Sequence, residues 1–193
     1  MSRAALLVLP LLLCLGAASA AELRSINVEH HKGRYTVSSE VWFDATVEQV
    51  FEVFRHWDLS TQFSSAIVES RDIAADEHGR LGYYVRNEGC VLLFCRSFVR
   101  QGHVELEVND ELRAFANPEN SDFKLSNETW TFVAENGGTV VIYQLLMEPD
   151  FWVPPGIGPY LIKRKFRKNG GDAIDRIESI AQGTTVQPVW NFD

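Results

Sequence analysis

The segment NETWTFVAENGGTVVIYQLLME, residues 127–148, decides the fold of this chain. Two runs rich in β-branched and aromatic residues flank Asn136-Gly137, the dipeptide most typical of a two-residue hairpin turn. A turn of that length places Glu135 opposite Gly138 and gathers the large apolar side chains of both runs on one face. The residues predicted to face inward are Trp130, Phe132, Val141, Tyr143 and Leu145. The sequence therefore predicts an antiparallel hairpin with one apolar face that needs a cover.

Similar patterns fill most of the chain before this hairpin. Residues 34–44 alternate as a strand, and a helix is expected after Thr46, a predicted N-cap with Gln49 at the capping-box spacing. A second helical turn is expected at residues 58–63. Six further strands are expected at 65–74, 79–89, 96–108, 111–117, 127–135 and 139–148, while the polar residues 21–33 are interpreted as a loose lead-in.

The end of the chain changes from strand period to helical period. Apolar residues recur at helical spacing from Ile162 to Ala181, after the turn-forming residues 154–158. This helix is the only predicted element long enough to cover the sheet. We therefore expect one domain over residues 34–182 and a short tail over 183–193.

Four strings in this order resemble a known superfamily. They are VWFDATVEQVF (41–51), Trp130-Thr131-Phe132, the Gly137-Gly138 hairpin and residues 154–165. They resemble the START/Bet v 1-like superfamily, also called SRPBCC, especially its bacterial proteins described as polyketide cyclase/dehydrase and lipid transport. The resemblance implies an α+β helix-grip fold, in which a curved antiparallel seven-stranded sheet surrounds a long C-terminal helix and an internal hydrophobic cavity. It implies no single function, because this fold hosts carriers, receptors, cyclases and chaperone activators.

Residues 1–20 have the three-part order of a secretory signal peptide. Arg3 gives a positive start, residues 4–16 are almost entirely aliphatic, and Ala18-Ser19-Ala20 supplies the small residues required at the cleavage site. The apolar run is too short to span a bilayer. Lipidation at Cys14 is the alternative, disfavoured because a leucine precedes that cysteine. We expect an exported, most naturally periplasmic, protein.

Composition and motifs limit the function classes. The formal net charge of −8 argues against general nucleic-acid binding, which depends on neutralising phosphates. The sequence has no HExxH, CxxC, GxSxG or glycine-rich phosphate loop, so we expect no metal, no cofactor and no catalytic residues. Five histidines are scattered, and only His103, near Glu105, follows a strand pattern. Such a residue is more often exposed on an outer strand face than catalytic.

Two cysteines, Cys90 and Cys95, remain after removal of the signal. In an oxidising compartment an even count favours one disulfide. In a continuous strand their Cα atoms would lie ~16 Å apart, whereas a disulfide needs ~5.5 Å, so bonding requires the chain to reverse between them. The alternative is an uninterrupted strand with two reduced thiols. The strand count of the resembled fold implies a turn here, with an apolar tip of Val91, Leu92, Leu93 and Phe94.

Two further segments are candidates for a membrane-facing mouth of the cavity. The connector Phe151-Trp152-Val153 carries large apolar groups before Pro154, and in the resembled fold it lies at the same end as the tip at residues 91–94. The first turns of the terminal helix carry a basic cluster of Lys163, Arg164, Lys165, Arg167 and Lys168. A helix N-terminus does not favour cations, so anionic lipid headgroups are a natural partner. Alternatively, the connector is a loop that only closes one end of the core. The basic cluster is alternatively a helix face exposed to solvent.

These features predict a binder or carrier of a lipid-like ligand that touches a membrane transiently at its mouth. One alternative is a polyketide cyclase or aromatase using the same cavity, which inward-facing acid/base groups would favour. The inward positions assigned from the sequence are apolar and favour the binder. Another alternative is a module that binds an envelope protein. Neither the ligand nor the oligomeric state follows from the sequence.

Overall fold

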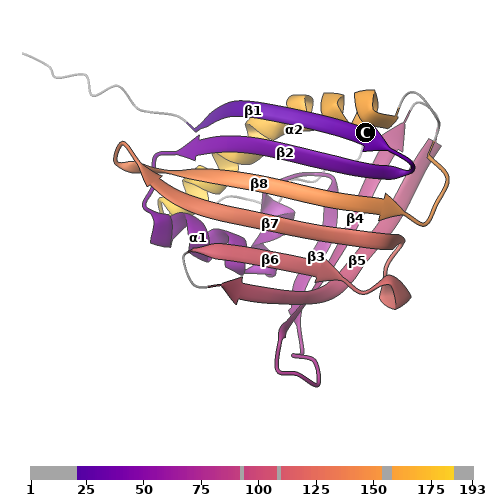
Figure 1. Ribbon diagram of the computed structural model, residues 1–193. Helices are drawn as coiled ribbons and strands as arrows, with labels where there is room; N and C mark the ends of the chain where they lie inside the picture. The colour runs from indigo at the N-terminus through magenta and orange to yellow at the C-terminus, as the bar shows by residue number, and fades with distance from the viewer. Residues whose placement is uncertain (1–20, 92–93, 108–109, 154–157, 185–193) are drawn as a thin grey trace, which may run out of the picture.

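The computed structural model describes residues 21–91, 94–107, 110–153 and 158–184 (Figure 1). An eight-stranded antiparallel sheet has the order β1-β2-β8-β7-β6-β5-β4-β3. Its strands are β1 Glu22–His31, β2 Arg34–Phe43, β3 Ile67–Ile73, β4 Leu81–Val91, β5 Phe94–Glu107, β6 Glu111–Ala116, β7 Phe123–Glu135 and β8 Gly138–Pro149. The helical elements are α1 Val47–Arg55, η1 Trp57–Gln62, η2 Pro118–Asn120 and α2 Gly158–Ala181. The predicted α+β helix-grip architecture is confirmed.

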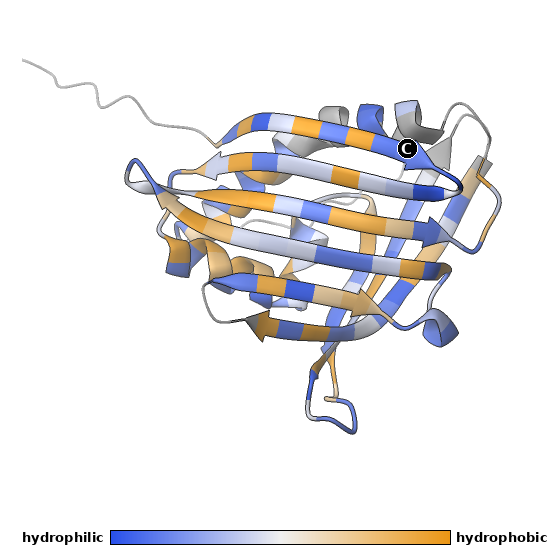
Figure 2. Cartoon of the chain, in the orientation of Figure 1, coloured by the Kyte–Doolittle hydropathy of each residue, from blue (hydrophilic) through white to orange (hydrophobic). Residues whose placement is uncertain are grey.

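The strand count of seven was wrong by one, because residues 21–33 are not a loose lead-in. They form β1, which pairs with β2 through a tight turn in which Lys32 and Gly33 both have positive φ angles, 49° and 84°. Only the side of β1 that carries Ile26 and Val28 is partly buried. Hydrophobic and polar residues consequently alternate along β1 in Figure 2. With only Leu23, Ile26 and Val28 apolar among its ten residues, the alternation is short, and the segment was interpreted as a polar lead-in.

The central hairpin has the predicted register. Glu135 pairs with Gly138, Trp130 with Tyr143 and Phe132 with Val141. Asn136 and Gly137 have φ angles of 52° and 83°, as a turn of this kind requires. Gly138 is also required sterically, since a Cβ atom there would lie 2.3 Å from the carbonyl oxygen of Phe43.

The two main helices pack on the same side of the curved sheet (Figure 1). Helix α1 begins with the predicted capping box, in which Gln49 Oε1 accepts from the Thr46 amide at 2.9 Å and Thr46 Oγ1 accepts from the Gln49 amide at 3.4 Å. Val50 of α1 and Ile177 of α2 join one buried core with Phe43 of β2. Among the described residues, no helix is both long enough and apolar enough to cross a membrane.

Candidate functional site

The five residues predicted to line a cavity share the inner face of β7 and β8. Trp130, Phe132, Val141 and Leu145 are buried, and Tyr143 packs against the core cluster that contains the first three. The rings of Trp130 and Tyr143 lie 5.3 Å apart, and Phe54 of α1 lies 6.2 Å from Trp130. This face therefore forms the core between the sheet and α1. Direct contact with a ligand stays a prediction.

Charged and polar side chains interrupt this apolar interior. Arg100 of β5 forms an ion pair with Glu128 of β7, and the Tyr143 hydroxyl donates to Glu128 Oε2 at 3.0 Å. The Glu128 side chain is 4% exposed and that of Arg100 is 15% exposed. Together with Tyr83 of β4, these three residues are called the polar interior group below. Tyr143 belongs to the predicted inner face, and Glu128 lies opposite Leu145 on the same pair of strands.

The polar interior group holds atoms whose hydrogen-bonding capacity is not used. In the described part of the chain, Tyr83 Oη, Arg100 Nε and the neighbouring Asn87 Nδ2 and Ser126 Oγ are buried without a hydrogen-bond partner. Each such atom costs about 1–3 kcal/mol when nothing compensates it. A molecule bound here could compensate this cost by supplying polar atoms.

The two tyrosines of this group are kept protonated by their surroundings. Burial raises the pKa of the Tyr143 phenol, and the positive charge of Arg100 only partly opposes that shift. Burial likewise raises the pKa of Tyr83, again opposed by Arg100. Both hydroxyls are therefore hydrogen-bond donors at neutral pH.

Tyr143 was predicted to face inward, whereas Glu128, Arg100 and Tyr83 were not, although the position of Glu128 follows from the hairpin. Residues 128, 130 and 132 share one face of a strand, so Glu128 had to point inward with Trp130. Arg100 had no such signal. Its position depends on the register of β4 and β5, in which Arg100 pairs with Val85.

The connector between β8 and α2 lies against the end of β5. Phe151 stacks on Phe98 of β5 with ring centroids 6.0 Å apart, and it contacts Phe123 of β7 at 5.6 Å. The Arg96 guanidinium lies 4.5 Å from the centre of the Phe151 ring. Trp152 beyond it is 73% exposed, whereas Val153 is partly buried. The connector and the β4–β5 hairpin thus lie at one end of the molecule, as the resemblance implied.

The chain reverses between the two cysteines. Cys90 pairs with Cys95 and Val91 with Phe94 across the β4–β5 hairpin, so the alternative of an uninterrupted strand is wrong. Leu92 and Leu93 lie outside the described residues, as do the side chains of Val91 and Phe94. The apolar tip itself therefore stays a prediction.

The basic cluster falls on the first half of α2. Lys163 is partly buried and Arg164 is exposed, while the side chains of Lys165, Arg167 and Lys168 lie outside the described part. The internal cavity expected under this half of the helix also stays a prediction. The described residues do include an open depression of about 420 Å³, lined by Gly79, Arg80, Leu81, Val104, Glu105 and Leu106. That depression lies at the far end of β4 and β5 from the connector.

His103 lies away from the interior. Its ring stacks on Phe115, its partner in β6, at 5.3 Å, and its Nε2 lies 3.4 Å from Glu105. The adjacent Val104 is buried in the core, so His103 points to the outer face of the sheet. It is not positioned to act on a molecule beside Glu128.

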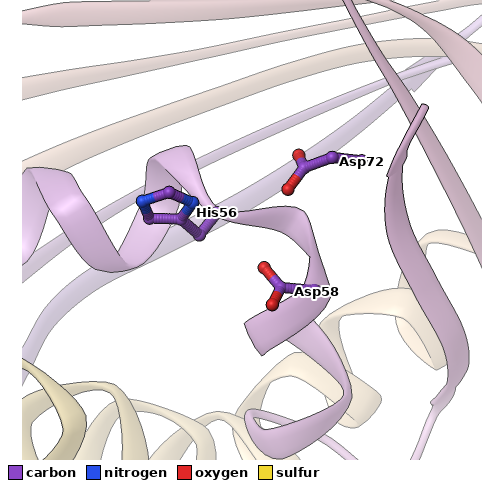
Figure 3. Close-up of side chains that lie close together, drawn as sticks. All are labelled: His56, Asp58 and Asp72. Atoms are coloured by element: carbon purple, nitrogen blue, oxygen red, sulfur yellow. The ribbon is translucent and has the colours of Figure 1, made fainter. Parts of the chain in front are cut away.

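One further cluster has the donor atoms of a metal site. His56, Asp58 and Asp72 come from the end of α1, from η1 and from β3, and their side chains converge in Figure 3. Their candidate ligand atoms lie within 4.8 Å of one another. All three side chains are exposed, and His56 Nε2 also lies 3.4 Å from Glu52. Because exposed acidic groups often gather without a metal, we assign this cluster no role.

Solved structures share this fold. A STAR-related lipid transfer protein from Xanthomonas axonopodis aligns with a TM-score of 0.61 and 17% identity, over 85% of this chain and 99% of its own. A START superfamily protein from Mycobacterium smegmatis aligns with a TM-score of 0.59 and 17% identity, over 75% and 98%. An aromatase/cyclase from a Streptomyces species aligns with a TM-score of 0.54 and 9% identity, over 77% and 94%.

These similarities establish the fold of the chain, which is the START/Bet v 1-like helix grip. No family model and no curated protein sequence matches the chain. At such low identity the function has to be argued from the residues of this protein.

Proposed function

We propose that the protein binds an amphipathic, lipid-like molecule and carries it outside the cytoplasm. The observation that supports this best is the polar interior group inside an otherwise apolar grip. An apolar body would contact the aromatic face of β7 and β8, and a polar end would meet Tyr83 and Arg100. A polar end could donate and accept hydrogen bonds with these atoms, whereas a hydrocarbon ligand has no groups that do so.

The solved structures with a similar fold are compatible with two classes of function. Their names include a lipid transfer protein and an aromatase/cyclase. Inward acid/base groups are the feature expected of the cyclase, and Glu128 with Tyr143 now supplies such groups. However, Glu128 is already paired with Arg100, and the raised pKa of Tyr143 makes its hydroxyl a weak acid at pH 7. Efficient general acids and bases have pKa values near the working pH, so the geometry favours binding over catalysis.

Solvent extraction of small molecules bound to the protein, after its purification from its own compartment, tests the binding proposal. We expect an amphipathic molecule in an amount comparable to that of the protein. A protein that carries none, and that converts an aromatic polyketide chain instead, would support the cyclase.

We further propose that the end carrying the connector contacts membranes. Trp152 is exposed and follows Phe151, whose ring contacts the Arg96 guanidinium; an exposed indole and a cation at one end of a protein suit a lipid–water interface. The basic cluster of α2 follows this connector in the chain, and each cation near an anionic surface contributes ~1 kcal/mol. A ligand could then enter without crossing water. An apolar end that binds an envelope protein is the alternative.

The spacing of the two cysteines permits a disulfide, which an oxidising compartment outside the cytoplasm would favour. Directly opposite residues of an antiparallel pair have Cα atoms about 4.5–5.5 Å apart, within the range that a disulfide needs. Cys90 and Cys95 occupy such a pair. We propose that they form a disulfide after export and hold the hairpin tip in one conformation.

A further inference from the structure

A buried carboxylate near the end of α2 joins the start of the sheet to the start of α1. Glu178 is 8% exposed. Its Oε2 accepts from the Ala21 nitrogen at 3.1 Å, and its Oε1 accepts from the Asp44 amide at 2.7 Å. One turn later, Gln182 Nε2 donates to the Asp44 carbonyl at 2.7 Å. The last turns of α2 thus hold two segments that lie far apart in the sequence.

Among the described residues, the hydrogen-bond partners of the Glu178 side chain are two backbone nitrogens. Within the described part of the chain, no lysine, arginine or histidine forms an ion pair with it. A buried carboxylate is costly unless an opposite charge or strong hydrogen bonds compensate it. The Ala21 nitrogen is the atom next to this carboxylate whose charge could change.

Ala21 is the first residue after the predicted signal peptide. Hydrolysis of the Ala20–Ala21 bond adds one water, leaving a carboxylate on Ala20 and an amine on Ala21. That amine is protonated at neutral pH, because the ordinary pKa of an α-amino group is about 7.7–8.0. The nitrogen that donates one neutral hydrogen bond in the precursor becomes an ammonium with three donors.

We propose that signal-peptide removal creates this ammonium as the counter-ion of Glu178, so that processing completes the fold. Charge-assisted hydrogen bonds are about twice as strong as neutral ones. The domain consequently reaches its full stability only after export and cleavage. This inference rests on the predicted signal peptide and is independent of the proposed ligand.

Two exported forms of the chain test the pair. One is the natural chain, for which intact mass should show Ala21 as the first residue. The other carries Gly-Ser inserted between Ala20 and Ala21, so that cleavage leaves the ammonium two residues away from Glu178. We expect the insertion to lower the folding equilibrium constant, measured by urea unfolding, by about five- to thirtyfold.

Substitution on α2 shows whether Glu178 is the partner. In a Glu178→Gln background the insertion should change the folding constant less than twofold, whereas Asp175→Asn, which removes an exposed carboxylate of the same helix, should preserve the full effect. An equal effect with and without Glu178, no effect in the natural background, or a mature chain that begins elsewhere would each overturn the proposal.

A chemical measurement covers the case in which Glu178→Gln does not fold. An ammonium held by Glu178 should react with an acylating reagent at pH 8 at least tenfold more slowly than the displaced amine of the insertion form. Equal acylation rates would contradict the pair.

Discussion

The ion pair between Arg100 and Glu128 places two charges where the neighbouring positions are apolar. Val85 and Leu145, their partners in adjacent strands, are both buried in the core. Such a pair contributes little to stability as a unit, because desolvation offsets the attraction between the charges. A task other than stability, such as holding the polar end of a ligand, would account for a buried ion pair at this place.

Removing one member of this pair should be far more harmful than removing both. Glu128→Ala leaves Arg100 buried without a counter-charge, and we expect a loss of about 3–5 kcal/mol in the free energy of unfolding. The double substitution Arg100→Met with Glu128→Leu should come within about 1 kcal/mol of the natural protein. Urea unfolding at pH 7 measures both. A single variant as stable as the double variant would show that the charges are not coupled.

At the scale of elements, the β3–β4 hairpin depends on one aspartate. Asp76 accepts from the backbone amides of Arg80 and His78 at 3.0 and 2.9 Å, and from Arg80 Nε at 2.7 Å. The hydrogen bond from the Arg80 amide is the largest cause that lowers the pKa of Asp76, to about 2. The loop is thus ordered by a carboxylate that must be ionised.

The pH dependence of this loop follows from that shift. The folded pKa lies below the unfolded value of about 3.9, so the contribution of Asp76 is present above pH 4 and is lost as the pH falls toward 2. NMR titration of the carboxyl carbon should give a midpoint near 2. Asp76→Asn should abolish this local transition. A midpoint near 4 would show that the hydrogen bonds do not persist in solution.

Elements with strong local signals were predictable, and elements defined by long-range pairing were less so. The capping box of Thr46 and the Asn136-Gly137 turn specify their geometry within a few residues, and the structure has both as predicted. Strand β1 was missed because its partly buried side, with Ile26 and Val28, becomes apparent only when it pairs with β2. Arg100 was missed for the same reason.

At the scale of the whole molecule, the connector end should determine membrane contact. We expect the protein without its predicted signal peptide to float with vesicles containing anionic lipid and to float less as salt is raised. Trp152→Ala should weaken this binding. Leu81→Ala removes a half-exposed leucine at the far end of β4 and is the matched control. If Trp152→Ala and Leu81→Ala float to the same extent, or if the natural protein does not float with the vesicles, contact at this end is contradicted.

If the grip holds an amphipathic ligand by its polar end, binding must depend on the charges of Arg100 and Glu128. Native mass spectrometry of protein purified without detergent from its own compartment distinguishes the natural chain from the Arg100→Met, Glu128→Leu double variant. We expect a bound amphipathic molecule on the natural chain and its loss from the folded double variant. An empty natural chain, or equal retention by both proteins, would contradict it.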